Sequence, residues 1–276
     1  MSASRSLDGV RLLRPLLGIA KAELQALLTA RGQAWIEDPS NANPAFERVR
    51  LREAADRAEE PQVEALLHRL GLERQRVESE AAGRLAESLT LHEAGWAELP
   101  ADALHEPDAA ALMAFGWLLQ SLGGGDYPVA EARRAEALAR IATDETADFT
   151  LGGCHLRRRG ARLEIHRDWG VITQRLAVTP GLSGLWDDRF AVTVSPQLEP
   201  KPSFTIARLG EAGLRELARL GRSSAGSGVP EASRPALPAL WQGDRLVSVP
   251  QLGFGGGLSA QFRPARAAAS GGFTVA

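Results

Sequence analysis

Apolar residues recur at helical spacing through the middle of the chain. Residues 62–91 place them three or four positions apart among polar and charged neighbours, which predicts one or two long amphipathic helices. Residues 108–122 are apolar on more than one side, and residues 129–141 repeat the helical spacing. Together these stretches predict a small helical domain.

Alternation of apolar and polar residues takes over after the helical stretches. Around three glycines it predicts a meander of strands, at residues 149–151, 154–157 and 162–165. Further along, it predicts three strands with a helix between the second and the third. We expect these elements at residues 189–194, 203–207, 211–220 and 245–249.

Turn-forming residues separate these elements. Residues 171–184 are expected to form a linker, and residues 221–233 are rich in Gly, Ser and Pro, which predicts a mobile surface loop. Residues 264–276 are expected to be a frayed tail.

The front of the chain carries shorter elements. The pattern predicts a strand at residues 10–13, a helix at residues 21–30 and a second short strand at residues 35–36. Turn chemistry follows at residues 38–41. This front piece has too little apolar surface to fold alone.

These elements add up to a multidomain α+β protein. We expect a front region at residues 1–57 and a helical domain with a β-hairpin at residues 58–170. A small α+β domain follows at residues 185–263, and the tail begins at residue 264.

The composition favours a globular protein of a reducing compartment. The chain has 276 residues, of which 44% are hydrophobic, enough for buried cores. Cys154 is the only cysteine, which excludes an internal disulfide framework. No apolar run has the length of a signal-peptide core or a membrane span. We therefore expect a cytoplasmic protein with no membrane partner.

The charge balance excludes a protein that coats DNA or RNA without selectivity. The formal net charge is −2, so any nucleic-acid contact must come from a local patch. Lys21 and Lys201 are the only lysines, and the remaining basic residues are arginines. Arginine suits bidentate phosphate contacts, although the same bias fits a GC-rich genome.

Candidate chemistry gathers at the front. Arg48, Arg50 and Arg52 are candidates to bind an anionic group, and Asp38 is a candidate to position a polar one. Two interpretations stay open. Asp38 and Asn41 either contact substrate or cap the next helix, and the arginines either contact substrate or pair with neighbouring carboxylates.

The densest basic run comprises Arg157, Arg158 and Arg159, beside Gly160. At a hairpin tip these side chains would offer several contacts to RNA phosphates. The alternative is a solvated turn that keeps the hairpin soluble, and the sequence does not decide between the two.

Two other patterns are weak. Residues 121–126 (SLGGGD) follow a helix rather than a strand, so we interpret them as a helix C-cap and not as a phosphate loop. Cys154, His155 and His166 fall short of the ligand number of a zinc site, so we expect no metal there. The cysteine is expected to be a buried small hydrophobe.

Three front segments resemble one known family. Residues 14–17 (RPLL), 35–41 (WIEDPSN) and 46–52 (FERVRLR) are similar to the close of the nucleotide-binding PP-loop domain of tRNA(Ile)-lysidine synthetases. Val49 stands where that family usually has asparagine, which removes a side-chain amide. Residues 234–249 resemble the C-terminal domain of the same family.

The resemblance implies a function and a set of sites. Such enzymes use ATP, with Mg²⁺, to join L-lysine to the wobble cytidine of tRNA(Ile). It implies that residues 1–57 are the end of an α/β nucleotide-binding domain and that the two following domains bind tRNA. The implied substrate contacts are Asp38, Asn41, Arg48 and Arg52, with the arginines on the polyphosphate and Asp38 on the incoming amine. The implied tRNA contacts are Arg157, Arg158, Arg159, Arg222 and Arg234.

The family's glycine-rich Ser-Gly-Gly-x-Asp-Ser loop is expected before the first matched segment, and only about a dozen residues stand there. We therefore expect the rear portion of such a ligase, inactive alone, with no ATP bound to this chain and no DNA partner. The alternative is a non-catalytic tRNA-binding module, or a partner subunit that completes a separate nucleotide-binding domain.

Overall fold

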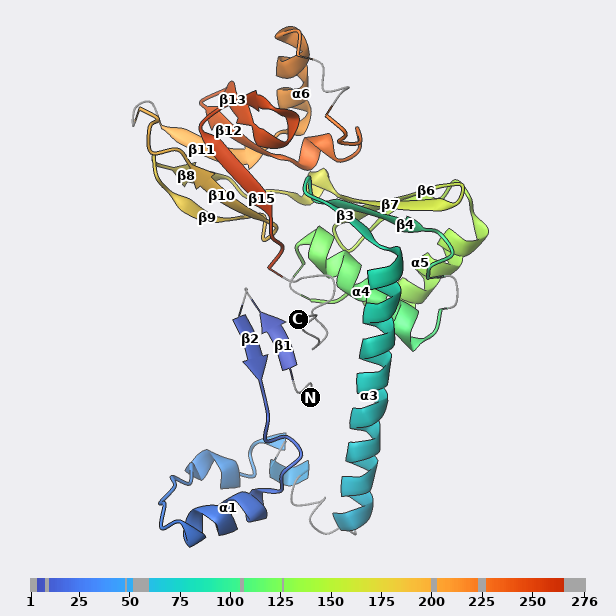
Figure 1. The fold of residues 1–276 in the computed structure, drawn as a ribbon, viewed down its shortest axis with the longest axis vertical. Helices are drawn as coiled ribbons and strands as arrows, with labels where there is room; N and C mark the ends of the chain where they lie inside the picture. Colours follow the sequence, from blue (N-terminus) through green and yellow to red (C-terminus); the bar gives the residue numbers. More distant parts are fainter. Residues whose placement is uncertain are drawn as a thin grey trace.

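The computed structural model describes most of the chain. Its described residues are 4–7, 10–47, 49–51, 60–104, 107–125, 127–199, 203–222 and 227–265. Figure 1 shows three regions: a front segment, a central group of helices on a sheet, and a C-terminal region of two further sheets. The predicted tail from residue 266 onward lies outside the described residues.

The front segment contains small elements with little packing between them. Strands β1 (Ser4–Leu7) and β2 (Val10–Leu13) form an antiparallel pair, followed by helix α1 (Lys21–Ala30) and the 3₁₀ turn η1 (Pro39–Ala42). The predicted strand at residues 10–13 and the predicted helix are confirmed. The predicted strand at residues 35–36 is wrong, because no described strand pairs with that stretch and Ile36 is 96% exposed.

Helix α3 (Glu60–Ser88) runs from the front segment to the central sheet as one long rod (Figure 1). Its C-terminal half buries Val77, Ala81 and Leu85 against the central domain. Apolar residues also continue through its first half, where Leu67 is 64% exposed. The two halves thus share one helical pattern, but only the second has a packing partner.

The central domain is a five-stranded antiparallel sheet covered by helices on one face. Helix α4 (Ala109–Gly123) is buried along most of its length, and α5 (Glu131–Thr143) packs beside it. Asp108 caps α4 by accepting a hydrogen bond from the Ala111 amide at 2.8 Å, as its short side chain favours. Gly124, in the left-handed region at φ 61°, ends α4 and confirms the predicted C-cap.

The strand order in this sheet is β3-β4-β7-β6-β5. The predicted meander is confirmed as strands β5, β6 and β7. The sequence did not predict β3 and β4, which precede α4. The bounds are β3 (Thr90–His92), β4 (Trp96–Pro100), β5 (Asp148–Leu151), β6 (Cys154–Arg159) and β7 (Arg162–Arg167).

The C-terminal region packs a three-stranded sheet, β15-β10-β9, near a five-stranded sheet, β14-β13-β12-β11-β8. Helix α6 (Gly210–Arg219) follows β11, and the short turns η2 (Trp169–Val171), η3 (Arg234–Ala236) and η4 (Pro250–Leu252) connect strands. The strands are β8 (Leu176–Val178), β9 (Ser183–Trp186), β10 (Phe190–Val194), β11 (Phe204–Arg208), β12 (Pro238–Gln242), β13 (Arg245–Val249), β14 (Phe254–Gly255) and β15 (Leu258–Phe262).

Two sequence expectations fail in this region. The predicted linker at residues 171–184 contains β8 and the start of β9, so the C-terminal sheets begin earlier than expected. The predicted loop at residues 221–233 is not all at the surface, because Val229 and Ser233 are buried against the sheets. Apolar packing outweighed the turn-rich composition of both stretches.

Candidate functional site

The front candidates lie around the turn η1. The amide of Asn41 donates to the Asp38 carbonyl at 3.0 Å, which forms the turn that the sequence predicted. Arg48 and Arg52 lie outside the described residues. Between them, Val49 is buried at 5% exposure, and Arg50 donates to the carbonyls of residues 44 and 45 at 2.9 and 3.2 Å. Arg50 therefore holds its own turn together.

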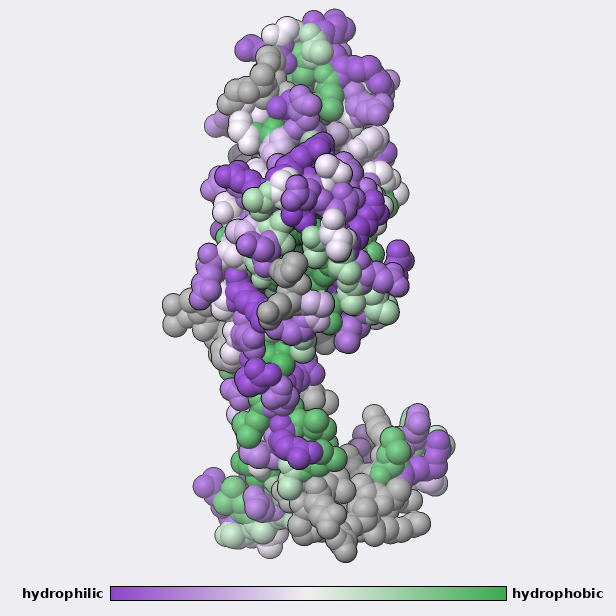
Figure 2. Space-filling model, turned by 90° about the vertical axis from the view of Figure 1, so that its right-hand side faces the viewer, coloured by the Kyte–Doolittle hydropathy of each residue, from purple (hydrophilic) through white to green (hydrophobic). Residues whose placement is uncertain are grey.

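Many exposed apolar side chains mark the same part of the molecule. It covers the front segment and the first half of α3, where Figure 2 shows hydrophobic residues gathered along the helix. Exposed patches of this kind mark interaction surfaces in soluble proteins. The members are Leu12, Leu13, Leu16, Leu17, Ile19, Leu27, Trp35, Ile36, Phe46, Leu51, Leu66, Leu67, Leu70 and Leu72. We call these residues the front apolar surface.

The β6–β7 hairpin positions the basic run. Gly160, at φ 60°, allows the tight turn between the strands, and Arg159 faces Arg162 across the end of the ladder. Both side chains are exposed, and Arg162 lies 3.2 Å from a Glu98 carboxylate oxygen. Arg157 is half-buried, with its Nε 3.2 Å from an Asp148 carboxylate oxygen. The hairpin tip therefore presents Arg159 and Arg162 to solvent.

Arg158 has a different environment from its neighbours. Its guanidinium donates to the carbonyls of Ile141 and Ala142, the latter at 3.0 Å, and its Nε donates to the Gly160 carbonyl at 2.8 Å. Only 13% of the side chain is exposed. These bonds satisfy backbone acceptors in the last turn of α5, so Arg158 ties that helix to the hairpin.

A surface cavity of about 590 Å³ lies at the C-terminal end of α6. The helix contributes apolar side chains to it, and the segment that follows contributes charged ones. The lining includes Leu214, Leu217, Ala218, Arg222, Glu231 and Arg234. The structure thus brings Arg222 and Arg234 together, although the sequence named them only by resemblance. We call this cavity the α6 pocket.

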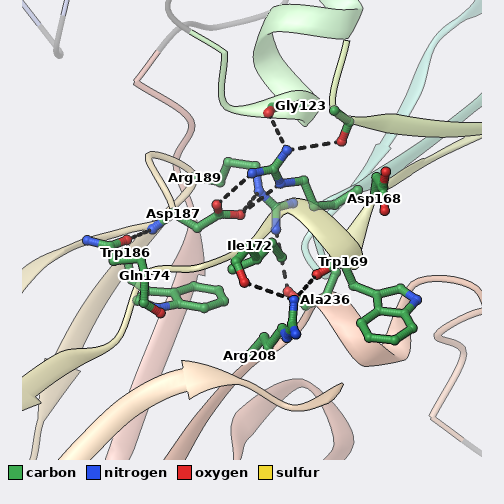
Figure 3. A network of polar contacts seen from close by, with 12 residues as sticks. Gly123, Asp168, Trp169, Ile172, Gln174, Trp186, Asp187, Arg189, Arg208 and Ala236 are labelled. Atoms are coloured by element: carbon green, nitrogen blue, oxygen red, sulfur yellow. Dashed lines mark hydrogen bonds and ion pairs between the residues drawn. The ribbon is translucent and has the colours of Figure 1, made fainter. Parts of the chain in front are cut away.

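A buried ion network joins the central sheet to the C-terminal region (Figure 3). Asp187 accepts from Arg167 at 2.8 and 3.0 Å and from Arg189 at 2.7 Å. Arg167 also donates to the carbonyls of Gly123 and Gly153, the latter at 3.0 Å. Arg189 is only 1% exposed, and burial lowers the pKa of its guanidinium to about 10 against the opposing effect of Asp187. We call Arg167, Asp187 and Arg189 the junction triad.

Other buried groups also cross this junction. The His166 ring lies 2.7 Å from the Ser233 hydroxyl and 3.3 Å from a Glu164 carboxylate oxygen. Burial lowers the pKa of His166 to about 4, so the ring is neutral at neutral pH.

Cys154 is buried, which confirms the expected small hydrophobe, and its burial raises the pKa of the thiol to about 12. Among the described residues, no three His, Cys, Asp or Glu side chains are placed to hold a metal ion.

Comparison with known proteins connects these features. A family model described as a PP-loop domain matches residues 1–57. The tRNA(Ile)-lysidine synthase of Ruegeria pomeroyi is 31% identical over 275 residues, which cover 95% of this chain. The chain is thus similar to tRNA(Ile)-lysidine synthases over most of its length. The enzymes of that name from Rhizobium meliloti and Brucella suis are 38% and 33% identical over 65% and 91% of the chain.

The matches cover less of the relatives than of this chain. The chain spans 60% of the length of the Ruegeria tRNA(Ile)-lysidine synthase, 39% of the Rhizobium enzyme and 57% of the Brucella enzyme. The PP-loop match and the mixed helices and sheets agree with the fold class expected from the sequence. Within the described residues, no helix has both the length and the apolar character needed to cross a bilayer.

Sequence reasoning missed the junction triad and the His166–Ser233 contact. Arg167 and Asp187 are 20 residues apart, and His166 and Ser233 are 67 apart, so no local motif links them. A partial signal existed for Asp187, because the Asp187–Asp188 pair suits left-handed backbone, and both residues have φ near 50°.

Proposed function

We propose that this chain forms the tRNA-binding part of a tRNA(Ile)-lysidine synthase, together with the end of its PP-loop domain. The observation that supports it most is the similarity to synthases over 95% of the chain, front segment included. The intact reaction would use ATP to activate the wobble cytidine of tRNA(Ile), and the lysine ε-amine would then displace AMP. A stand-alone RNA-binding module is not favoured, since the relatives matched from front to rear bear the synthase name.

The tRNA contacts fall on two surfaces. At the hairpin, Arg159 and Arg157 are the candidates for phosphate contacts, and Arg162 joins them because it shares the exposed tip. Arg158 contributes indirectly, by fixing the hairpin on α5. At the C-terminal end, Arg222 and Arg234 contact tRNA from the α6 pocket. The central and C-terminal regions thus each contribute one surface that contacts the tRNA.

The front segment serves the chemical step. Asp38 and Asn41 would contact substrate at the turn η1, with Arg48 and Arg52 as the candidate cations next to it. ATP and its Mg²⁺ would be held by a Ser-Gly-Gly-x-Asp-Ser loop, as the resemblance implies, and we expect no stoichiometric ATP binding by this chain. Its site of action would be the cytoplasm, where tRNA is modified.

Equilibrium titration of the full chain with a labelled tRNA(Ile) transcript tests this function. We expect saturable binding that weakens as salt rises, because phosphate contacts release counterions. Arg159→Ala should weaken binding and reduce the salt slope by about one. Arg215→Ala is the matched control, since Arg215 is 73% exposed on α6 and pairs with Glu211. Salt-independent binding, or equal loss in both variants, would refute the proposal.

A further inference from the structure

The end of α6 fixes where Arg222 leaves the helix. The Gly221 amide donates to the Ala218 carbonyl at 3.0 Å, and the Arg222 amide donates to the Leu217 carbonyl at 2.9 Å. This pair of bonds is the Schellman motif, and Gly221 at φ 65° supplies the left-handed residue that it requires. Arg222 therefore starts from a defined backbone position at the wall of the α6 pocket.

The opposite wall is also held in place. The Nε of Arg234 donates to the Val229 carbonyl at 2.9 Å, and its Nη1 lies 3.8 Å from a Glu231 carboxylate oxygen. The Arg234 side chain is 16% exposed, whereas the Glu231 side chain is 91% exposed. Arg234 thus forms a fixed positive wall, and the Glu231 carboxylate stands at the rim.

The pocket combines an apolar, a cationic and an acidic surface, and a nucleotide has a group that suits each of them. Leu214 and Ala218 offer an apolar wall to a flat ring, Arg222 offers a cation to a phosphate, and Glu231 offers an acceptor to an amino group. Its 590 Å³ lies within the roughly 300–1,000 Å³ of small-molecule sites. A base-paired helix keeps its bases paired and stacked and cannot place one in such a cavity, whereas an unpaired nucleotide can.

We propose that the α6 pocket binds one unpaired, amino-bearing nucleotide of the tRNA, with its phosphate on Arg222 and its base amino group on Glu231. This inference rests on the proposed function and deepens it. Among pyrimidines it predicts a preference for cytidine, because the cytosine amino group donates to a carboxylate. The uracil carbonyl at the same position would face the carboxylate with no proton to share.

Amide chemical shifts of the ¹⁵N-labelled full chain test the pocket with three probes: CMP, UMP and inorganic phosphate. We expect CMP to shift the amides of Gly221 and Arg222 saturably, with affinity roughly tenfold higher than UMP, as one good base-edge contact gives. Phosphate alone should bind more weakly than either nucleotide. Shifts of equal size and affinity from all three probes would reduce the pocket to a simple anion site and overturn the proposal.

Variants separate the two contacts. Arg222→Ala should weaken CMP and UMP alike, roughly tenfold, because both lose the charge-assisted phosphate contact. Glu231→Gln should bring CMP and UMP close to equal affinity. Ala218→Glu should block both nucleotides, and Ala212→Glu is its control, since residues 212 and 218 are both exposed on α6 but only the latter lines the pocket. A control as damaging as Ala218→Glu would contradict the assignment.

Competition with tRNA(Ile) distinguishes this inference from the function on which it rests. If tRNA binds and displaces CMP from the pocket, both stand. If tRNA binds while CMP remains in place, the pocket assignment is wrong and the tRNA-binding function survives. If CMP binds but the chain shows no affinity for tRNA(Ile), the proposed function fails, and the pocket is a nucleotide site of another kind.

Discussion

The front apolar surface and the central domain both carry apolar side chains on helices, but the first exposes them and the second buries them. Of the side chains described between residues 12 and 72, Val49 alone is buried. In α4, which carries apolar residues on more than one side, most of them are buried, with Phe115, Leu118 and Leu122 at 0% exposure. Within α3, where one pattern runs through both halves, the packing partner makes the difference, because a helix gains stability from packing its apolar face and little from propensity alone.

This contrast fits the match of residues 1–57 to a PP-loop domain. Domains of α/β type bury their elements in layers, so helices and strands from such a layer keep apolar faces that need neighbours. The front segment has the side chains for that packing, and the described residues supply few contacts for them. The front segment therefore exposes apolar side chains of a kind that the central domain buries.

Truncation of a core side chain should give the largest loss in the free energy of unfolding. Phe115→Ala should lower the free energy of unfolding by about 3–5 kcal/mol, since it leaves a cavity in a well-packed core. Leu27→Ala, at a residue 49% exposed on α1, should change it by less than about 0.5 kcal/mol. Chemical denaturation measures both, and comparable losses would show that the front is packed in solution.

A change in the junction triad should give the second-largest loss of stability. Asp187→Asn keeps a residue that tolerates the left-handed backbone at φ 52° but removes the charge between two buried arginines. We expect a loss of about 3 kcal/mol, because uncompensated buried charge is costly. Glu211→Gln, which breaks the exposed pair with Arg215, should cost less than about 0.5 kcal/mol. Equal effects would show that the junction is hydrated and weak.

Acid should weaken the junction through His166. The folded pKa of about 4 lies below the unfolded value of about 6.5, so the unfolded chain binds the proton first. This contribution to stability is complete above pH 6.5 and is lost as pH falls toward 4, by about 2–3 kcal/mol. The ring resonances of His166 should stay those of neutral imidazole at pH 5.5. Titration of this ring near pH 6.5 would exclude the buried contact with Ser233.

The front apolar surface should respond least in stability. Replacing Leu66, Leu67 and Leu70 together by serine should change the free energy of unfolding by less than about 1 kcal/mol, because each side chain is at least 44% exposed. The same change should reduce the binding of a hydrophobic dye, since it removes an exposed patch. A large loss of stability, with no change in dye binding, would place these leucines in a packed interface.

Sequence periodicity predicted the elements whose signal is local. The helices at α1, α4, α5 and α6 follow apolar spacing, and β5 to β7 follow alternation around glycines. The short strands β3, β8 and β9 were missed because three or four residues give too little pattern and their neighbours in the sheet decide their state.

The candidate sites also have a part that the sequence predicted and a part that only the fold shows. Composition identified the basic run at the hairpin, but it did not show that Arg158 turns inward to α5 while Arg159 stays exposed. Arg222 and Arg234 line one cavity although they lie apart in the sequence, and no local pattern predicts that. The junction triad depends on contacts between separate regions, which no local motif encodes.

Hydrogen exchange of the full chain with and without tRNA(Ile) tests the central claim most directly. The account predicts slow exchange in α4 and fast exchange in α1 in the free chain, because only the former is packed. Added tRNA should protect amides at the β6–β7 hairpin tip and at the end of α6. Slow exchange of α1 in the free chain, or binding that leaves both of these surfaces unprotected, would contradict the account.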